Sequence, residues 1–355
     1  MNINDIISEQ NKIVSEGWTD NLVSCFGNTS QTYFCSVGNK NIEDRLWDLA
    51  SVTKLYSLIF ILSLHEHNEF DITKKIKDYT NSYPNISNLY IYELLNFSYE
   101  LCTPMRIDKC SSFTEALSTL YNVEVKNHNV TYSDIGIMVI TQIINEYFNS
   151  SLFFYNHSTN LFKKLGLTRT LWWTDIKDTE TNIEEYNFEH KLLNNQLTTL
   201  NTKHGECHDI KAKIIPYAGH AGLFSSAKDV ALFATKLLSG SIISDKTISL
   251  ITDTKYDKWN STHHYGLLCN KKHNIEKYSE VPFSCSDNSI AISGYTGCYL
   301  LLDFKKREFV FIGANRINNR ITNINYGDFS SNYICTKDYV FRKDNLIKLI
   351  INSFT

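Results

Sequence analysis

Alternating apolar and polar positions predict β-strands near both ends of the chain. Residues 22–38 alternate in this way and form a predicted pair of strands. Helical patterns flank the strands, one over residues 4–16 and one over residues 337–353, where the spacing predicts an amphipathic helix. Further strand-like runs come late in the sequence, at residues 265–269, 289–292, 298–303 and 308–314.

The middle of the chain follows a helical pattern instead. Residues 112–120 and 133–148 are the clearest predicted helices. Ser226 and Asp229 have the spacing of a capping box and predict the start of another helix, which ends near Leu238. Strands early, helices in the middle, strands late and a helix last predict an α/β (α+β) fold. We expect an antiparallel sheet flanked by helices, with an inserted, mostly helical subdomain.

The same order predicts where the chain divides. Residues 1–70 and 206–355 are expected to form the α/β domain, and residues 71–205 the helical insertion. The two parts together are expected to make one catalytic unit. Within the first part, a strand-like run at residues 45–50 gives way to a helix-like run at residues 55–67.

The composition is that of an ordinary globular protein. Of 355 residues, 43% are hydrophobic and 21% are charged, and the formal net charge of −3 gives no reason to expect nucleic acid or an anionic membrane as a partner. The longest apolar run, residues 55–64, is too short to span a membrane, and the N-terminus lacks the pattern of a secretory signal. Nine cysteines without metal or disulfide-framework spacing favour a cytoplasmic location.

Ser51 and Lys54 are the first pair of residues that suggests chemistry. They lie three residues apart where the strand-like run becomes a helix, so their side chains share one helical face and can meet. A serine hydroxyl becomes a nucleophile when a neighbouring base takes its proton, and a lysine with a depressed pKa can be that base. The helix N-terminus adds free N–H groups that suit an oxyanion.

Tyr132 is a second candidate, directly before Ser133 and Asp134 at the start of a predicted helix. A tyrosine near a Ser/Lys pair can relay protons, because a neighbouring ammonium lowers the cost of its phenolate. Asp134 can cap the helix or hold Lys54. The tripeptide alone also fits a surface tyrosine followed by a helix-capping serine, so both interpretations stay open at this point.

Five segments of the chain, in order, resemble serine hydrolases related to class C β-lactamases and penicillin-binding proteins. Residues 47–54 (WDLASVTK) resemble the nucleophile segment of that family, and residues 132–134 (YSD) resemble its second motif. In an esterase and peptidase branch, a histidine–aspartate pair precedes a GHAGLFS stretch. Residues 205–209 (GECHD) and 218–225 (AGHAGLFS) are similar to these two segments. Residues 294–298 (GYTGC) resemble the strand-turn region near the C-terminus.

The resemblance covers roughly residues 21–316 and implies acyl transfer through a covalent ester. Ser51 would be the acylated nucleophile and Lys54 the general base that activates it. Tyr132 would assist proton transfer to the leaving group and later with the water that deacylates the enzyme. The Ser51 N–H and an N–H of the late strand would form the oxyanion hole. This chemistry needs neither a metal nor an organic cofactor.

The third motif departs from the family pattern. It is usually Lys-Thr-Gly or His-Thr-Gly, and here Ile292, Ser293 and Gly294 stand in its place, before Tyr295. We expect Ser293, Gly294 and Tyr295, with Asp134, on the substrate and oxyanion side of the site. The Ser293 hydroxyl can still bind a carboxylate or a carbonyl group, but the cation is gone. Its loss argues against penicillin recognition and towards a neutral or apolar acyl group.

Five further residues are expected to support the site. His208 and Asp209 either orient the substrate or form a local hydrogen-bond clamp, and the clamp is the favoured interpretation. His220 is expected to be a packed, hydrogen-bonded structural histidine where the backbone turns tightly. Trp172 and Trp173, in a predicted loop, can wall a substrate cleft or plug the core.

The sequence therefore predicts a serine hydrolase that cleaves an ester or amide of a small substrate. It would be an esterase, amidase or peptidase and a poor β-lactamase, with its oligomeric state left open. One alternative is an acyltransferase on a specialised metabolite, in which an alcohol or amine replaces water. The other is a silent, ligand-binding member; Ile292 favours it, and the intact Ser51, Lys54 and Tyr132 speak against it.

Overall fold

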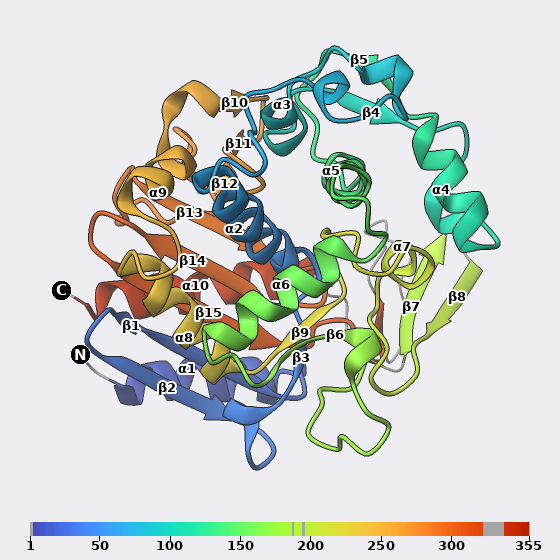
Figure 1. The fold of residues 1–355 in the computed structure, drawn as a ribbon. Helices are drawn as coiled ribbons and strands as arrows, with labels where there is room; N and C mark the ends of the chain where they lie inside the picture. Colours follow the sequence, from blue (N-terminus) through green and yellow to red (C-terminus); the bar gives the residue numbers. More distant parts are fainter. Residues whose placement is uncertain (1–2, 187, 194–195, 322–336, 355) are drawn as a thin grey trace.

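A large antiparallel sheet joins the beginning of the chain to its later part (Figure 1). The computed structural model describes residues 3–186, 188–193, 196–321 and 337–354. The sheet has eight strands in the order β10-β11-β12-β13-β14-β15-β1-β2. These strands are β1 (Leu22–Asn28), β2 (Thr32–Val37), β10 (Lys258–Trp259), β11 (His264–Tyr265), β12 (Asn270–Lys271), β13 (Ser289–Ser293), β14 (Tyr299–Asp303) and β15 (Glu308–Ala314).

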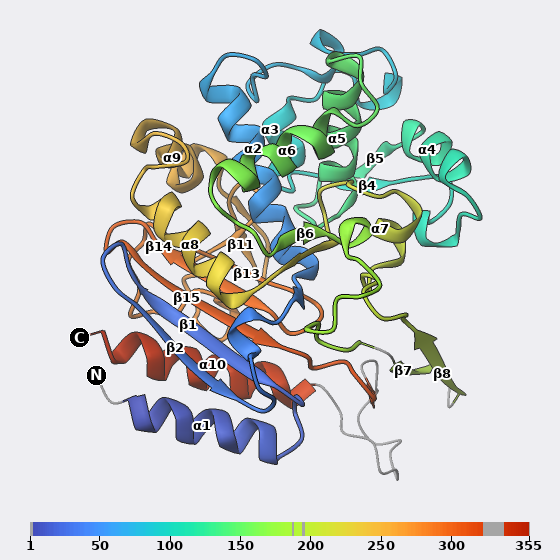
Figure 2. The same cartoon turned by 60° about the horizontal axis from the view of Figure 1, so that its bottom comes forward.

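Helices cover both faces of this sheet (Figure 2). The helices α1 (Ile3–Ser15) and α10 (Lys337–Asn352) lie side by side on one face. The helices α2 (Thr53–Glu66) and α8 (Ala227–Leu238) lie on the other face. On the same side as α2 are α3 (Ile91–Leu95), α4 (Phe113–Tyr121), α5 (Ile135–Tyr147), α6 (Phe153–Lys164), α7 (Ile210–Ile214) and α9 (Asp245–Thr252).

The central strands are apolar on both faces because each face meets a helical layer. Along β15, the buried Phe309 and Phe311 pack into the core on the α2 and α8 side. The alternate residues Val310 and Ile312 pack into the core under α1 and α10. Successive side chains of a strand point to opposite faces, so one unbroken apolar run serves two cores. Burying each such side chain contributes about 1.5–3 kcal/mol.

Small sheets lie beside the main one and carry the candidate motifs. The strand β9 (Leu223–Ser225) pairs with β3 (Trp47–Asp48) on one side and with β6 (Thr170–Trp172) on the other. The remaining strands form two more small sheets: β4 (Glu100–Cys102) with β5 (Glu124–Asn127), and β16 (Arg320–Ile321) with β7 (Phe188–Leu193) and β8 (Gln196–Asn201). Because Asp48 lies opposite Phe224, the segment that precedes Ser51 is held against the GHAGLFS stretch.

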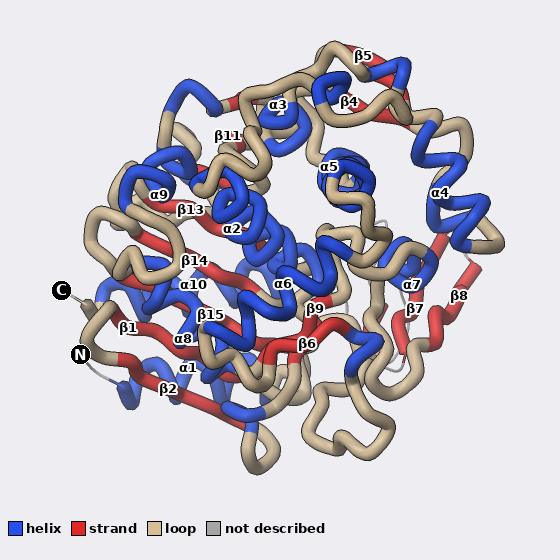
Figure 3. Tube along the Cα trace, in the orientation of Figure 1, coloured by secondary structure: helices blue, strands red, loops and turns tan. Residues whose placement is uncertain are grey.

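The predicted fold class is confirmed: a mixed α/β molecule with an antiparallel sheet flanked by helices. Figure 3 shows that the chain between β3 and β10 is mostly helix and loop, interrupted by short strands. The division into residues 1–70 with 206–355 and an insertion 71–205 stays a prediction, as does the cytoplasmic location. None of the described helices is long and apolar enough to cross a membrane.

Two local predictions were wrong. The run 265–269 is not one strand, because β11 ends at Tyr265 and the Gly266 N–H bonds to the Cys269 carbonyl, which closes a turn. Leu268 adopts a left-handed φ of 51° in this turn. Trp172 does not lie in a loop, because it is the last residue of β6.

Candidate active site

The serine of the first motif sits in a tight turn directly before helix α2. Ala50 has a left-handed φ of 45°, which is uncommon for a residue with a Cβ atom and marks local strain. Ser51 follows in a 3-10 turn, and Lys54 lies in the first turn of α2. Their side chains meet as predicted: Lys54 Nζ lies 3.0 Å from Ser51 Oγ and donates to it.

Tyr132 reaches the same oxygen atom from a different segment. Its hydroxyl donates to Ser51 Oγ at 2.8 Å, and Lys54 Nζ lies 4.9 Å from the centroid of its ring. Of the two interpretations left open by the sequence, the structure therefore favours a tyrosine beside the Ser/Lys pair. The pKa of the Tyr132 phenol is raised, because desolvation of the group outweighs the stabilisation of its phenolate by the Lys54 ammonium.

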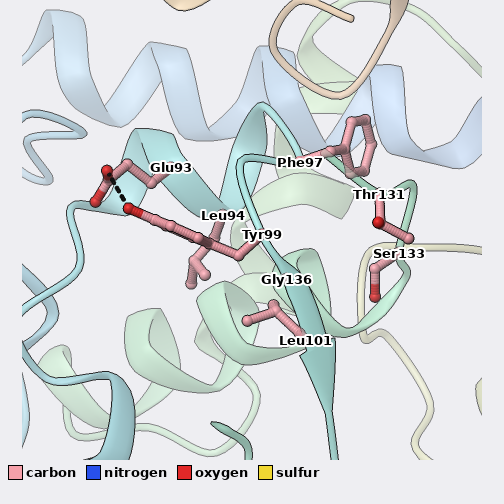
Figure 4. Close-up of a pocket in the computed structure, with 8 residues that line it drawn as sticks. All are labelled: Glu93, Leu94, Phe97, Tyr99, Leu101, Thr131, Ser133 and Gly136. Atoms are coloured by element: carbon pink, nitrogen blue, oxygen red, sulfur yellow. Dashed lines mark hydrogen bonds between the residues drawn. The ribbon is translucent and has the colours of Figure 1, made fainter. Parts of the chain in front are cut away.

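The loop that carries Tyr132 is held from behind by α3 and the turn that follows it (Figure 4). The Thr131 N–H donates to the Phe97 carbonyl at 3.1 Å, and the ring of Phe97 lies 5.0 Å from the ring of Tyr132. At Gly136 a Cβ atom would come within 2.7 Å of the Leu94 carbonyl, so only glycine allows α5 to approach this closely. The eight residues drawn in Figure 4 line a small pocket next to the loop that carries Tyr132.

Lys54 is fully buried and all three of its N–H donors have partners. Besides Ser51, it donates to the His220 carbonyl at 3.1 Å and pairs with Asp134 Oδ1 at 2.7 Å. Burial alone would lower the pKa of Lys54, but the charges and hydrogen bonds of Asp134 and Tyr132 together outweigh that effect and raise the pKa. The sequence argument expected a depressed pKa at this lysine, and the structure gives the opposite direction.

Asp134 links Lys54 to a second lysine and a second aspartate. Asp134 Oδ2 lies 2.8 Å from Lys211 Nζ, and Lys211 Nζ lies 3.3 Å from Asp209 Oδ2. Asp209 Oδ1 lies 3.0 Å from His220 Nε2. Burial would raise the pKa of Asp134 and of Asp209, but the neighbouring cations outweigh burial and hold both pKa values below the usual range.

The oxygen and nitrogen atoms of Asp134, Asp209 and His220 lie within 4.8 Å of one another, a spacing that could suit a metal ion. Two ammonium groups, those of Lys54 and Lys211, already compensate the two carboxylates. A metal ion would take the carboxylates from these ammonium groups and leave the fully buried Lys54 charge without its ion-pair partner. The arrangement therefore fits an ionic network better than it fits a metal centre.

A cavity of about 580 Å³ opens directly onto Ser51 and Tyr132. Its wall contains Ser293, Gly294 and Tyr295, so the structure brings the third predicted motif to the same place as the first two. The remaining lining residues are Thr262, His263, Tyr265, Asn270, Lys277, Tyr278, Ser279, Glu280, Ile292, Gly297, Cys298, Arg316, Lys343 and Asp344.

The end of β13 approaches the nucleophile loop very closely at Gly294. A Cβ atom there would lie 2.6 Å from the Leu49 carbonyl oxygen. The Gly294 N–H is itself engaged, because it donates to the Cys298 carbonyl at 2.6 Å. Glycine at this position therefore sets the distance between the late strand and Ser51.

The third motif lacks a positively charged residue, but other segments place lysine and arginine side chains at the cavity. Lys343 on α10 is 6% exposed and donates to Ser293 Oγ at 3.1 Å. Ser293 in turn donates to Glu280 Oε2 at 2.8 Å. Arg316 lies over the Tyr295 ring, 4.8 Å from its centroid. Sequence reasoning missed Lys343 and Arg316, because neither belongs to a recognisable motif and only the folded sheet brings them beside Ser293.

The supporting histidines and aspartate lie behind the site, outside the cavity. His208 and Asp209 do not clamp each other: His208 Nε2 lies 2.6 Å from Glu189 Oε2, while Asp209 accepts from the Ala212 N–H and caps α7. His220 is fully buried, bonded to Asp209, and its carbonyl holds Lys54. This agrees with the expected packed, hydrogen-bonded histidine.

The two tryptophans do not line the cavity. Trp172 is 1% exposed and packs in the core, with its ring 5.6 Å from that of Tyr217. Trp173 is partly buried and donates its indole N–H to the Ala212 carbonyl at 3.3 Å. The sequence left two roles open for the tryptophans, and Trp172 has the second one: its side chain fills space in the core.

Comparison with known sequences gives one family over most of the chain. A family model described as Beta-lactamase matches residues 13–321. N-acetylmuramyl-L-alanine amidase of Bacillus subtilis (strain 168) is 26% identical over 292 residues, which cover 73% of this chain but only 65% of that protein. A putative D-alanyl-D-alanine carboxypeptidase of Salmonella enteritidis PT4 is 23% identical, over 78% of this chain and 71% of that protein.

Solved structures of the same fold match nearly the whole chain. D-amino acid amidase from Ochrobactrum anthropi SV3 superimposes with a TM-score of 0.69 at 17% identity, covering 99% of both chains. A class C β-lactamase from Rhodobacter sphaeroides gives 0.69 at 15% identity, covering 98% of this chain and 99% of that one. EstCE1, described as a hydrolase with promiscuous acyltransferase activity, gives 0.71 at 13% identity, covering 97% and 98%.

Proposed function

The chain belongs to the Beta-lactamase family, and from this premise we propose that it cleaves a small ester or amide through an acyl-enzyme on Ser51. It is a hydrolase of the β-lactamase fold, related to D-alanine carboxypeptidases, amidases and esterases. The observation that carries the proposal is the meeting of Lys54 Nζ and the Tyr132 hydroxyl at one oxygen, Ser51 Oγ, at 3.0 and 2.8 Å.

Acylation begins when neutral Lys54 takes the proton of Ser51 as the Oγ attacks the acyl carbon. The bond from Oγ to carbon forms, and the bond from carbon to the leaving oxygen or nitrogen breaks. Tyr132 gives its proton to the leaving group and is reprotonated by the Lys54 ammonium, so no charge is stranded. Water then attacks the ester, its proton passes through the same two side chains, and Ser51 recovers its hydroxyl.

The negative charge of the tetrahedral intermediate requires donors aimed at it. We assign this role to the backbone N–H groups of Ser51 and Tyr295. The close approach of Gly294 to the Leu49 carbonyl supports the assignment, because it holds the end of β13 beside the nucleophile loop. The Gly294 N–H already donates to the Cys298 carbonyl, which supports the next residue, Tyr295, as the proposed donor of the strand end.

In the resting enzyme, the Lys54 side chain is protonated at neutral pH. The raised pKa of Lys54 means that the neutral, basic form is a small fraction at neutral pH. We therefore expect acylation to accelerate as the pH rises, because more of the enzyme then carries an unprotonated Lys54.

We propose acylated amines or esters of modest size as the substrates. Two of the relatives are an amidase and a putative carboxypeptidase, and both names describe cleavage of an amide bond. The cavity offers aromatic walls as well as Lys343, Arg316 and Glu280, so it suits a polar substrate that carries charged groups. The third motif alone favoured a substrate with a neutral acyl group. The charged side chains that line the cavity instead support a substrate with a charged group.

The proposal is tested by intact-mass measurement after exposure to a fluorophosphonate, a penicillin and a panel of p-nitrophenyl esters. We expect a mass increase equal to one acyl or phosphonyl group in the wild type and none in Ser51→Ala. Ser63→Ala is the matched control, because Ser63 lies on the same helix α2 but outside the cavity lining. It should label like the wild type.

Two results would decide against the proposal. Undiminished labelling of Ser51→Ala would assign the nucleophile to another residue. A folded wild type that takes up none of the probes would favour the silent, ligand-binding alternative.

A further inference from the structure

Glu189 is a buried acidic residue that none of the proposed chemical steps uses. It lies on β7, and its side chain is 0% exposed. Tyr295 donates its hydroxyl to Glu189 Oε1 at 2.5 Å, and His208 Nε2 lies 2.6 Å from Oε2. Lys191 Nζ lies 3.4 Å from the same Oε2. A buried carboxylate is stable only with such partners, so losing any of these contacts would cost free energy of folding.

The contacts of Glu189 continue to the turn that carries the nucleophile. The His208 N–H donates to Asp48 Oδ2 at 2.7 Å. The other oxygen of Asp48 accepts from the Ala50 N–H at 2.8 Å. Asp48 is 1% exposed, and Ala50 is the left-handed residue directly before Ser51. One buried polar chain therefore joins the Tyr295 side chain to the turn at Ser51.

A second set of contacts closes this chain into a ring. The Thr296 hydroxyl donates to the Asp48 carbonyl at 2.7 Å. The ring of His208 is stacked on that of Tyr295, with centroids 5.4 Å apart and planes inclined by 26°. The nucleophile turn is thus held by the Asp48 carboxylate, and the segment after β13 is held by the Glu189 carboxylate and the Asp48 carbonyl.

We infer that Glu189, His208 and Asp48 are positioning residues that fix the separation of the Ser51 and Tyr295 N–H groups. The inference rests on the proposed function, in which these two groups bind the oxyanion. Glu189 acts from the β7–β8 hairpin, which extends from the body of the molecule (Figure 2), and none of the three residues lines the cavity. Donors that are fixed before the reaction stabilise developing charge without reorganisation, which is why their spacing matters.

The test compares Glu189→Gln with the wild type on an oxygen ester and on the matching thionoester, which carries sulfur in place of the carbonyl oxygen. Glutamine keeps the size but not the charge, so the hydrogen bonds to His208 and Tyr295 weaken. We expect kcat for the oxygen ester to fall about 100-fold, the order of loss for a 1 Å misplacement. KM should change by less than about 3-fold, because substrate binding is not the function affected.

The oxygen-to-sulfur rate ratio separates a positioning role from a general loss of stability. It should fall in Glu189→Gln, because a distorted oxyanion hole discriminates less between oxygen and sulfur. Glu184→Gln is the matched control: Glu184 is 3% exposed, and its carboxylate bonds to Arg45 at 2.8 Å and to Asn21, which are not members of the polar chain. We expect it to lower the unfolding midpoint while it keeps kcat and the rate ratio.

Tyr295→Phe decides the question if Glu189→Gln does not fold. It removes one hydroxyl from a side chain that is 40% exposed, and kcat should fall about 10-fold with the same change in rate ratio. Acylation of the wild type together with unchanged kcat and rate ratio in the folded variants would overturn this inference alone. A wild type that is never acylated would overturn the proposed function and this inference with it.

Discussion

At the scale of single residues, the protonation of Lys54 controls the proposed reaction. Its raised pKa comes from Asp134, whose carboxylate lies 2.7 Å away. Replacing Asp134 with asparagine removes the negative charge but leaves the Lys211 ammonium in place. The protonated form of Lys54 then loses its main support, so its pKa must fall.

Asp134→Asn should therefore move the acidic limb of the pH–rate profile for acylation to lower pH by about 1 to 3 units. The measurement is the second-order rate of fluorophosphonate labelling between about pH 7 and about pH 11, because the pKa of an ordinary lysine is about 10.4 and that of Lys54 is raised. Asp287→Asn serves as the control, because Asp287 is 93% exposed and distant from the network. A limb that stays in place in Asp134→Asn would remove Lys54 from the role of base.

Contacts between residues that are close in the sequence could be predicted from the sequence alone. Ser51 and Lys54 are three residues apart on one turn, so helix geometry alone brings them together. Tyr132 could be named only through the family resemblance, and no local rule connects it to Ser51. Lys211, Glu189 and Lys343 gave no signal, because a charged residue in a sequence does not show whether it faces solvent or a buried partner.

At the scale of elements, the fit between β13 and the nucleophile loop rests on Gly294. Its Cβ would lie 2.6 Å from the Leu49 carbonyl, a distance that real Cβ atoms do not adopt. Gly294→Ala should push the end of β13 away from Ser51 and reduce the acylation rate about 100-fold. Single-turnover kinetics with a p-nitrophenyl ester measures this directly.

Gly266→Ala is the matched control for that experiment. A Cβ there would lie 3.0 Å from Lys271 Cδ, and its three nearest neighbours are side-chain atoms rather than a backbone carbonyl, so a shift of a few tenths of an ångström relieves the contact. We expect this variant to acylate at close to the wild-type rate. Equal rates in the two alanine variants would show that Gly294 does not set the distance between the strand and the loop.

Elements with strong local signals were predicted well, and elements that depend on distant partners were not. Ser226 accepts from the Asp229 N–H at 3.2 Å, and α8 ends at Leu238 as its pattern predicted. The paired strands β4 and β5 and the hairpin β7–β8 were not predicted. The strand β3 is only two residues long within the predicted run 45–50, because Ala50 already turns the chain towards Ser51.

At the scale of the whole molecule, the ionic network behind Ser51 ties together segments that are far apart in the sequence. It joins α2 through Lys54, the residue before α5 through Asp134, the start of α7 through Asp209 and Lys211, and the segment before β9 through His220. Sequence patterns could predict the main sheet and its flanking helices, because their apolar periods are local. They could not predict this network, because it forms only after four separate segments have met.

The network makes the stability of the folded protein depend on pH in a defined direction. The pKa values of Asp134 and Asp209 are held below the ordinary value of 3.8 by Lys54, His220 and Lys211, despite burial. A carboxyl whose pKa is lowered by folding stabilises the folded state above its unfolded pKa. That contribution is lost as the pH falls through the unfolded value towards the folded one. The free energy of unfolding should therefore decline below about pH 4.

Chemical denaturation of the wild type and of Asp209→Asn, measured from neutral pH down to about pH 3, tests this dependence. At neutral pH the variant should be less stable by about 2 kcal/mol, because His220 and Lys211 lose a charged, partly buried hydrogen-bond partner. Below about pH 4 the wild type should lose more stability than the variant, so the two curves converge. Parallel curves over the whole range would show that Asp209 contributes no linked proton, and the stabilising network would then have to rest on Asp134 alone.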